Sequence, residues 1–299
     1  MDEPAFLAAL RALPLHPAAR ELADDAAVIE VGGETLVLTH DVMVEGVHFL
    51  PAQDMADVAW KLVAVNLSDL AAKGAEPVGV LLGFQLGGGE ERFLAGLDEA
   101  LRTFGAPLLG GDTVSGGTAG GPGPRSFGLT AIGRASHTPV PSRGGARSGD
   151  RVWLTGAVGG AMLGLEAIRD GSGADSERYR RPRPRLAEGR ALAPLVGAMM
   201  DVSDGLLLDG WRMARASGVA ISLNSAAVPV ADPARRGECL RWGDDYELLF
   251  ALPGDRDPPV SASPIGWVED GPAILLLDGR PLGPEDHLGY QHASVRDAW

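Results

Sequence analysis

Lysine and cysteine are nearly absent from this 299-residue sequence. Cys239 is the sole cysteine, so no intrachain disulfide can form and nothing points to an oxidising compartment. Lys61 and Lys73 are the only lysines, and neither lies in a G-x-x-x-x-G-K-[ST] loop, which excludes a Walker-type nucleotide site. Any phosphate bound here must therefore be held by metal ions and arginines.

A basic surface and a long apolar run are also missing. The formal charge of -14 and the pI near 4.8 argue against nucleic-acid and anionic-membrane partners, which require a basic stripe. No apolar run approaches the ~18 residues of a membrane span, and the acidic start MDEPAFLAAL is unlike a signal peptide. We expect a cytoplasmic globular protein whose partners are small molecules or metal ions, with no nucleic acid and no membrane.

The N-terminal half alternates strand and helix patterns. Apolar periodicity and glycine turns predict a hairpin at 27–39, a strand at 78–86, a helix at 90–104 and a strand at 127–134. The Gly/Pro-rich stretch 118–124 indicates a mobile loop. Residues 139–150, rich in turn residues and arginine, indicate a linker between an N-terminal domain at 1–138 and a C-terminal domain at 139–299.

The C-terminal half has the same mixture. We predict helices at 161–169 and 206–216 and strands at 151–155, 219–223, 246–252, 264–268 and 273–277. Residues 170–189, with alternating arginine and proline, are predicted to form a surface loop that cannot hold a helix. The fold class is therefore α/β (α+β), with two mixed domains.

One predicted helix, within residues 58–73, carries a polar stripe. Asn66, Asp69 and Lys73 share one face because residues three, four and seven apart stack on a 3.6-residue period. A solvent-facing stripe is the ordinary explanation of such a pattern. Similar acidic residues before and after this helix, each beside a glycine or at the end of an apolar run, favour instead the floor of an anionic, metal-collecting site.

Those acidic residues lie at predicted turns. The hairpin is expected to return Asp41 to Asp25, Gly111 precedes Asp112, and Asp201 and Asp204 flank a serine. Turn and helix-cap roles would also explain each of them. Gathered together, such carboxylates would repel one another without cations, and their oxygens suit Mg²⁺ bound with the phosphates of ATP, as in phosphoryl transfer. His48, between apolar neighbours, is by spacing alone more typical of a structural histidine.

Six segments, in this order, resemble the thiamine-monophosphate kinase family: DDAAVIEVGGETLVLTHDVMVEGVHFL, AVNLSDLAAKGAEP, LLGGDTVSG, SRGGARSGDRVWLTG, MMDVSDGLLLD and WGDDYELLF. The family belongs to the aminoimidazole ribonucleotide synthetase-like superfamily. The resemblance implies a PurM-like fold, a homodimer whose N-terminal sheets form a barrel, and direct in-line transfer of the ATP γ-phosphoryl group to thiamine monophosphate with several Mg²⁺ ions.

The resemblance also implies the site residues, with metals neutralising charge and no residue acting as a catalytic base. Metal contacts are expected at Asp25, Thr39, His40, Asp41, Asp69, Asp112, Asp201 and Asp204. ATP contacts are expected at Gly111, Asp112, Arg143 and Ser203. Thiamine monophosphate contacts are expected at His48, Asp244 and Tyr290.

Three positions depart from the family pattern. Ala23 stands where glycine usually precedes the paired acids. His40 replaces a small hydroxyl residue, so a metal contact there would come from the backbone. Asp244 replaces glutamate and is one methylene shorter.

Two alternatives remain open. Another ATP-using enzyme of the superfamily is the nearer one, although Cys239 is neither the N-terminal cysteine of a selenophosphate synthetase nor the C-terminal cysteine of a hydrogenase-maturation relative. The other is a non-catalytic metal- or nucleotide-binding module whose acidic residues serve as caps.

Overall fold

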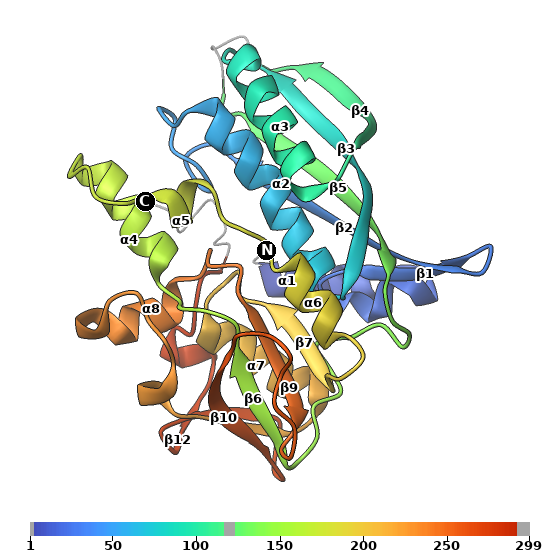
Figure 1. Cartoon of the computed structure of the whole chain (residues 1–299), viewed down its shortest axis with the longest axis vertical. Helices are drawn as coiled ribbons and strands as arrows, with labels where there is room; N and C mark the ends of the chain where they lie inside the picture. Colours follow the sequence, from blue (N-terminus) through green and yellow to red (C-terminus); the bar gives the residue numbers. More distant parts are fainter. Residues whose placement is uncertain (1–2, 117–122, 292–299) are drawn as a thin grey trace.

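The computed structural model describes residues 3–116 and 123–291 and contains two β-sheets (Figure 1). One sheet has five strands in the order β1-β2-β5-β3-β4, and the other has seven in the order β12-β11-β8-β10-β6-β9-β7. The predicted α+β class with two mixed domains is confirmed. The proposed boundary between residues 138 and 139 falls in the segment that joins the last strand of the first sheet to the first strand of the second.

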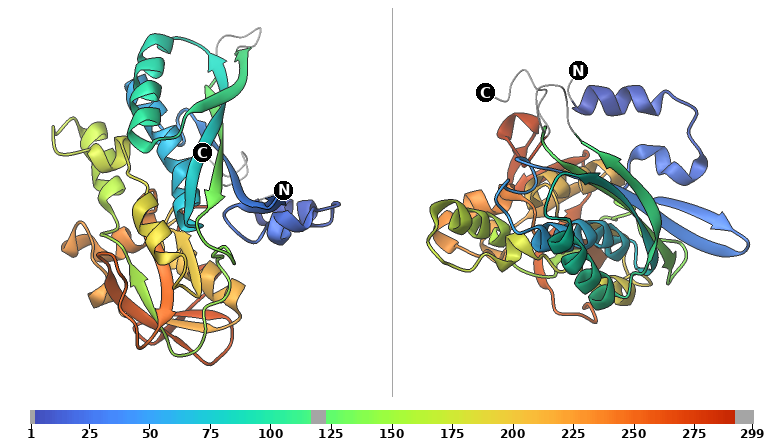
Figure 2. Two further views of the ribbon diagram at one scale, coloured as in Figure 1. Left: turned by 45° about the vertical axis from the view of Figure 1, so that its right-hand side comes forward. Right: turned by 90° about the horizontal axis from the view of Figure 1, so that it is seen from above.

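The N-terminal sheet curves as a half-barrel around two helices (Figure 2). Its strands are β1 Ala27–Val31, β2 Glu34–Val44, β3 Ala75–Leu86, β4 Leu108–Ser115 and β5 Ser126–Ala135, and its helices are α2 Met55–Ala72 and α3 Glu90–Phe104. Every pairing is antiparallel except β3 with β4. A short helix, α1 Glu3–Arg11, precedes the sheet. The predicted hairpin, strands and helices of this half are confirmed within a few residues.

The C-terminal sheet is also mixed. Its strands are β6 Asp150–Leu154, β7 Ala198–Asp201, β8 Ala220–Leu223, β9 Leu248–Pro253, β10 Ser263–Glu269, β11 Ile274–Leu277 and β12 Arg280–Leu282. The accompanying helices are α4 Gly160–Asp170, α5 Glu177–Arg180, α6 Leu186–Leu192, α7 Leu206–Ser217 and α8 Arg236–Trp242. Five of these elements, β7, β12, α5, α6 and α8, have no counterpart in the sequence prediction, because short elements carry little periodic signal.

The prediction of a helix-free surface loop at 170–189 is wrong. The segment contains α5 and the start of α6, and it packs on α2. Arg180 and Arg181 both pair with the buried Asp57, at 2.7 and 2.5 Å, and the indole of Trp60 donates to the carbonyl of Pro182 at 2.9 Å. These contacts to a distant helix stabilise two short helices that local sequence alone would not support. Most of the predicted loop at 118–124 lies outside the described residues.

Helix α2 lies at the centre of the molecule. It packs against the first sheet, α3, α6 and β7, and all of its residues except Asp69 are buried. Its C-terminal alanines, Ala71 and Ala72, belong to the same apolar cluster as β9 of the second sheet. The polar stripe therefore does not face solvent. No helix among the described residues combines the length and apolar character needed to cross a membrane.

We expect Gly96→Ala to destabilise the protein, because α3 approaches α2 most closely at this glycine. A Cβ at residue 96 would lie 2.1 Å from the carbonyl oxygen of Ala56. Overpacking of this kind costs about 1–3 kcal/mol, which denaturant unfolding would measure. Gly237→Ala in α8, where the added Cβ would lie 3.9 Å from the Arg241 side chain, is the matched control. It should stabilise by up to about 1 kcal/mol, and equal effects of the two changes would contradict the close approach.

Candidate active site

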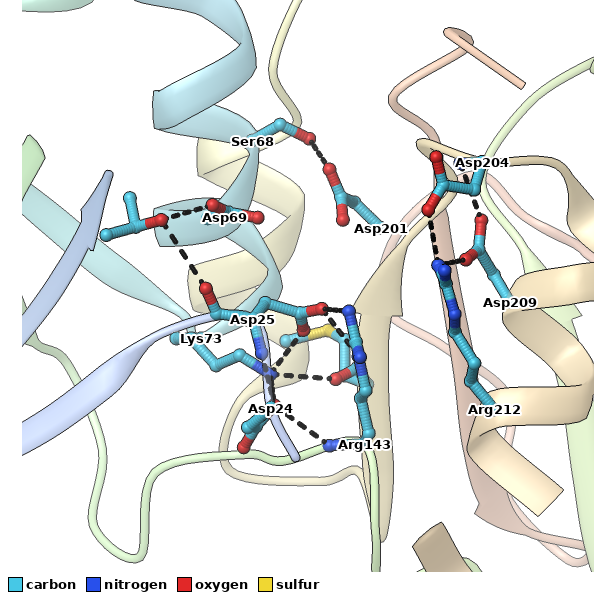
Figure 3. A network of polar contacts seen from close by, with 12 residues as sticks. Asp24, Asp25, Ser68, Asp69, Lys73, Arg143, Asp201, Asp204, Asp209 and Arg212 are labelled. Carbon is cyan, nitrogen blue, oxygen red and sulfur yellow. Dashed lines mark hydrogen bonds and ion pairs between the residues drawn. The ribbon is translucent and has the colours of Figure 1, made fainter. Parts of the chain in front are cut away.

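Three aspartates from different parts of the chain meet beside α2 (Figure 3). Asp25 precedes β1, Asp69 lies in α2 and Asp201 ends β7. One carboxylate oxygen from each lies within 4.8 Å of the others. These three residues, hereafter the aspartate triad, confirm that acids far apart in the sequence gather on the polar face of α2.

Two cations hold Asp25 in its ionised form. Lys73 Nζ lies 2.7 Å from one carboxylate oxygen, and Arg143 Nε donates to the other at 2.7 Å. Burial alone would raise the pKa of Asp25, but Arg143 and Lys73 together lower it to about 2. Arg143, predicted to contact ATP, thus contacts the triad directly.

Asp24 is a supporting residue that sequence reasoning did not assign to the site. Its carboxylate pairs with Lys73 and with Arg20, both at 2.5 Å, and accepts from the backbone N–H of Arg143 at 3.3 Å. Ala23, where the family usually has glycine, has φ -110°, a conformation open to any residue. The departure at Ala23 therefore places no strain on this turn.

The carboxylates of Asp69 and Asp201 are held by hydroxyl groups, whereas that of Asp25 is held by cations. The Thr39 hydroxyl donates to Asp69, and the Ser68 hydroxyl donates to Asp201 at 2.6 Å. Burial, reinforced by the neighbouring carboxylates, raises the pKa of Asp69 well above its ordinary value and that of Asp201 to about 8. Hard oxygen ligands that repel one another in this way fit a divalent cation such as Mg²⁺.

Asp41 and Asp204 lie next to the triad. The backbone N–H of Asp41 donates to Asn66 Oδ1 at 2.9 Å, and burial together with Asp204 and Asp25 raises the pKa of Asp41 to about 6. Asp204 pairs with Arg212 at 2.5 Å, and its backbone N–H donates to the fully buried Asp209 at 3.0 Å.

His40 and Asp112 lie apart from the triad. Successive side chains of a strand point to opposite faces, so the buried Thr39 faces α2 while His40 faces outward and contacts Thr130 at 2.9 Å. The imidazole is thus unavailable to the triad, consistent with a contact through the backbone alone. Asp112 is exposed, and the expectation that it lies at a turn is wrong, since Gly111 and Asp112 lie inside β4.

Strand register explains the separation of Asp112. It pairs with Gly83, which pairs with Gly128, which pairs with Val42 beside Asp41. Three strand spacings of about 4.8 Å put Asp112 roughly 14 Å from β2. Its carboxylate accepts from the backbone N–H of Thr113 at 2.9 Å.

The residues predicted to contact thiamine monophosphate lie on neighbouring loops. His48 Nδ1 accepts from the backbone N–H of Val44 at 3.0 Å. The backbone N–H of Asp244 donates to the carbonyl of Ser203 at 2.7 Å, and that of Tyr290 donates to the carbonyl of Asp204 at 2.9 Å. The structure thus brings Ser203, Asp204, Asp244 and Tyr290 side by side.

Sequence reasoning also missed Lys61, Asp209 and Arg212. Each contacts a predicted site residue; Lys61 and Asp209 are buried, and Arg212 is half-buried. Lys61 could have been found from its position: a lysine on an apolar, buried helix requires an acidic partner from elsewhere in the chain.

Two family models match most of the chain. The family model described as AIR synthase related protein, N-terminal domain matches residues 23–135, and its C-terminal counterpart matches residues 147–273. The chain is 39% identical to the thiamine-monophosphate kinase of Caulobacter vibrioides, covering 92% of this chain and 86% of that protein. The thiamine-monophosphate kinase of Escherichia coli K12 is 35% identical, with 91% of each chain covered.

The chain belongs to the thiamine-monophosphate kinase family. The family resemblance seen in the sequence is thereby confirmed. A solved structure of this family, AaThiL complexed with AMPPCP and TMP, superposes with a TM-score of 0.85 and covers 98% of this chain and 97% of that one at 27% identity. The hydrogenase maturation protein HypE, with a TM-score of 0.69 at 23% identity over 88% of this chain and 91% of that one, shares the fold.

We expect the metal-free protein to lose stability as pH rises from 6 to 8. The pKa of Asp201 is about 8 in the folded state and about 3.9 in the unfolded state, so between pH 6 and 8 only the folded protein keeps this proton. The stabilisation that the bound proton gives to the folded state therefore decreases as pH rises. Denaturant unfolding in EDTA would measure the slope, and Asp201→Asn should make it shallower, while other buried acids with raised pKa values, such as Asp209, keep part of it. Asp255→Asn, at an exposed residue, is the control, and equal wild-type stability at both pH values would contradict the expectation.

Proposed function

We propose that this chain phosphorylates thiamine monophosphate to thiamine diphosphate by direct in-line transfer of the γ-phosphoryl group of ATP. Relatives that match nearly the whole chain are named thiamine-monophosphate kinase. The structurally similar AaThiL was solved with AMPPCP and TMP. The aspartate triad is the structural observation that carries the proposal, because oxygen ligands gathered at a buried point suit the binding of polyanionic phosphates through metal ions. We expect the reaction to take place in the cytoplasm.

Mg²⁺ is the cofactor that these residues fit. Asp25, Asp69 and Asp201 would hold it, with Asp41 and Asp204 close enough to serve further ions. Bound Mg²⁺ supplies charge neutralisation and orientation for the phosphates. Around it, Lys73 and Arg143 keep Asp25 ionised, while the hydroxyls of Thr39 and Ser68 orient Asp69 and Asp201.

No general base is needed for this reaction. A phosphate monoester has a second pKa near ~6, so the attacking oxygen is already deprotonated at neutral pH. The obstacle is repulsion between two polyanions, about 4 kcal/mol for each charge pair at ~4 Å and an effective dielectric constant near ~20. Arg143, on the segment between the two sheets, pairs with Asp25 and would contact the phosphates beside the triad.

A second copy of the chain would complete the N-terminal sheet. The outer side of β3 and the whole of β4 are exposed and carry large apolar side chains, including Leu81, Leu108, Leu109 and Val114. β4 is an edge strand with unpaired backbone groups, which favours association. We therefore expect a homodimer. Gly111 and Asp112 lie in β4, so they would make their predicted ATP and metal contacts at the dimer interface.

The activity is tested by measuring ADP release from ATP and Mg²⁺ with thiamine monophosphate, free thiamine or no acceptor. We expect thiamine diphosphate from the monophosphate alone, and at least about a 100-fold loss of kcat in Asp69→Asn or Asp201→Asn, since metal charge would be misplaced. Glu166→Gln, in a surface ion pair with Arg235, is the control. ADP release indifferent to the acceptor would point to another ATP-using enzyme of the superfamily, and no release at all would favour a binding module.

Sedimentation tests the dimer. We expect a species of twice 31.0 kDa at micromolar concentration and a monomer in Val114→Glu, because a charge on β4 would be buried in the interface. Leu94→Glu alters a residue of similar exposure on the outer side of α3 and should leave the dimer intact. A monomeric wild-type protein would contradict the expectation.

A further inference from the structure

Lys61 is buried in the middle of α2, although lysine is among the residues least often buried. Its side chain is 2% exposed, and Nζ lies 2.5 Å from Asp244 Oδ2. Nζ also donates to the carbonyl of His48 at 3.3 Å and lies 4.0 Å from the centre of the Tyr179 ring. Three partners thus compensate a cation that is withdrawn from water.

The partners of Lys61 come from separate parts of the chain. His48 lies in the loop after β2, Tyr179 in α5 and Asp244 between α8 and β9. The Tyr179 hydroxyl donates to the same His48 carbonyl at 3.3 Å. Lys61 therefore joins the two residues, His48 and Asp244, at which the family resemblance implies contacts to thiamine monophosphate.

Asp244 is held from a second direction as well. The Tyr246 hydroxyl donates to its other carboxylate oxygen at 2.8 Å. Asp244 and Tyr246 have φ of 62° and 54°, a left-handed conformation that non-glycine residues adopt only where their surroundings enforce it. The Asp244 side chain is still 25% exposed, so the carboxylate retains an open side for a ligand.

Lys61 in α2 and Lys73 at its C-terminal cap contact different parts of the site. Lys73 pairs with Asp25 in the triad, whereas Lys61 lies twelve residues earlier, which is about 18 Å along a helix. A change at Lys61 is therefore far from Lys73 and the Asp25 carboxylate that Lys73 holds.

We propose that Lys61 is a positioning residue for the acceptor substrate, fixing the Asp244 carboxylate and the His48 loop so that together they bind thiamine monophosphate. The proposal rests on the kinase function proposed above. It predicts that loss of the Lys61 ammonium weakens binding of the acceptor and spares binding of ATP. Lys61 does not itself touch the ligand, because its Nζ is enclosed by protein atoms.

Steady-state kinetics of Lys61→Met tests the proposal. We expect KM for thiamine monophosphate to rise at least tenfold, while KM for ATP stays within twofold. The double variant Lys61→Met/Asp244→Asn should be no worse than the worse single variant, because the pair acts as a unit. Thermal shifts give an independent readout: stabilisation by thiamine monophosphate should be lost and stabilisation by AMPPCP kept.

Asp57→Asn is the matched control. Asp57 lies one turn earlier on α2, is equally buried and pairs with Arg180 and Arg181. We expect this variant to lower the melting temperature without changing either KM. Tyr246→Phe, which removes the second donor to Asp244 and leaves no unpaired buried charge, should raise KM for the acceptor alone and keeps the proposal testable if Lys61→Met does not fold.

Several results would overturn the role of Lys61. They are equal rises of both KM values, additive effects in the double variant, or a selective rise of the acceptor KM in Asp57→Asn. A wild-type protein that releases no ADP with thiamine monophosphate would instead contradict the proposed function. A wild-type protein that turns over, with an unchanged acceptor KM in both Lys61→Met and Tyr246→Phe, would contradict the positioning role alone.

Discussion

Repulsion among carboxylates that have little access to water is the constraint on which the rest of this structure depends. Asp201 is buried and Asp25 and Asp69 are half-buried where they meet, and carboxylates in that position are tolerated only when cations or donors compensate them. Lys73 and Arg143 compensate Asp25, but Asp69 and Asp201 receive hydroxyl donors alone. The site thus keeps an excess of negative charge at the point where a metal ion is required.

The same constraint explains why α2 is enclosed on every side. A helix that carries Lys61, Asp57 and Asp69 and is capped by Lys73 could remain buried only if other segments brought partners to it. The turn before β1 brings Asp24 and Asp25 to Lys73, and the loop before β9 brings Asp244 to Lys61. The segment that contains α5 and α6 brings two arginines to Asp57. The helix therefore fixes both sheets relative to one another through ion pairs as well as apolar packing.

Two departures from the family pattern, Ala23 and Asp244, are accommodated by the residues next to them. Ala23 adopts an ordinary backbone conformation, while the left-handed residues of that turn are Arg20, Glu21 and Leu22. Asp244 is shorter than the usual glutamate, yet it is held by Lys61 and the Tyr246 hydroxyl. Each substitution is accommodated by its immediate contacts, without disturbing the aspartate triad.

The mixed fold, most strands and helices, and the meeting of Asp25, Asp69 and Asp201 could be predicted from the sequence. Periodicity, glycine turns and motif spacing are local signals, and they suffice for β1, β2, α3 and for the polar face of α2 that carries Asp69. Long-range contacts were needed to show that 170–189 holds α5 and the start of α6, that Asp112 lies across the sheet from the triad, and that both lysines are buried. Those outcomes depend on pairs such as Ser68–Asp201 and Lys61–Asp244, separated by 133 and 183 residues. No local pattern encodes which distant residue will neutralise a buried charge.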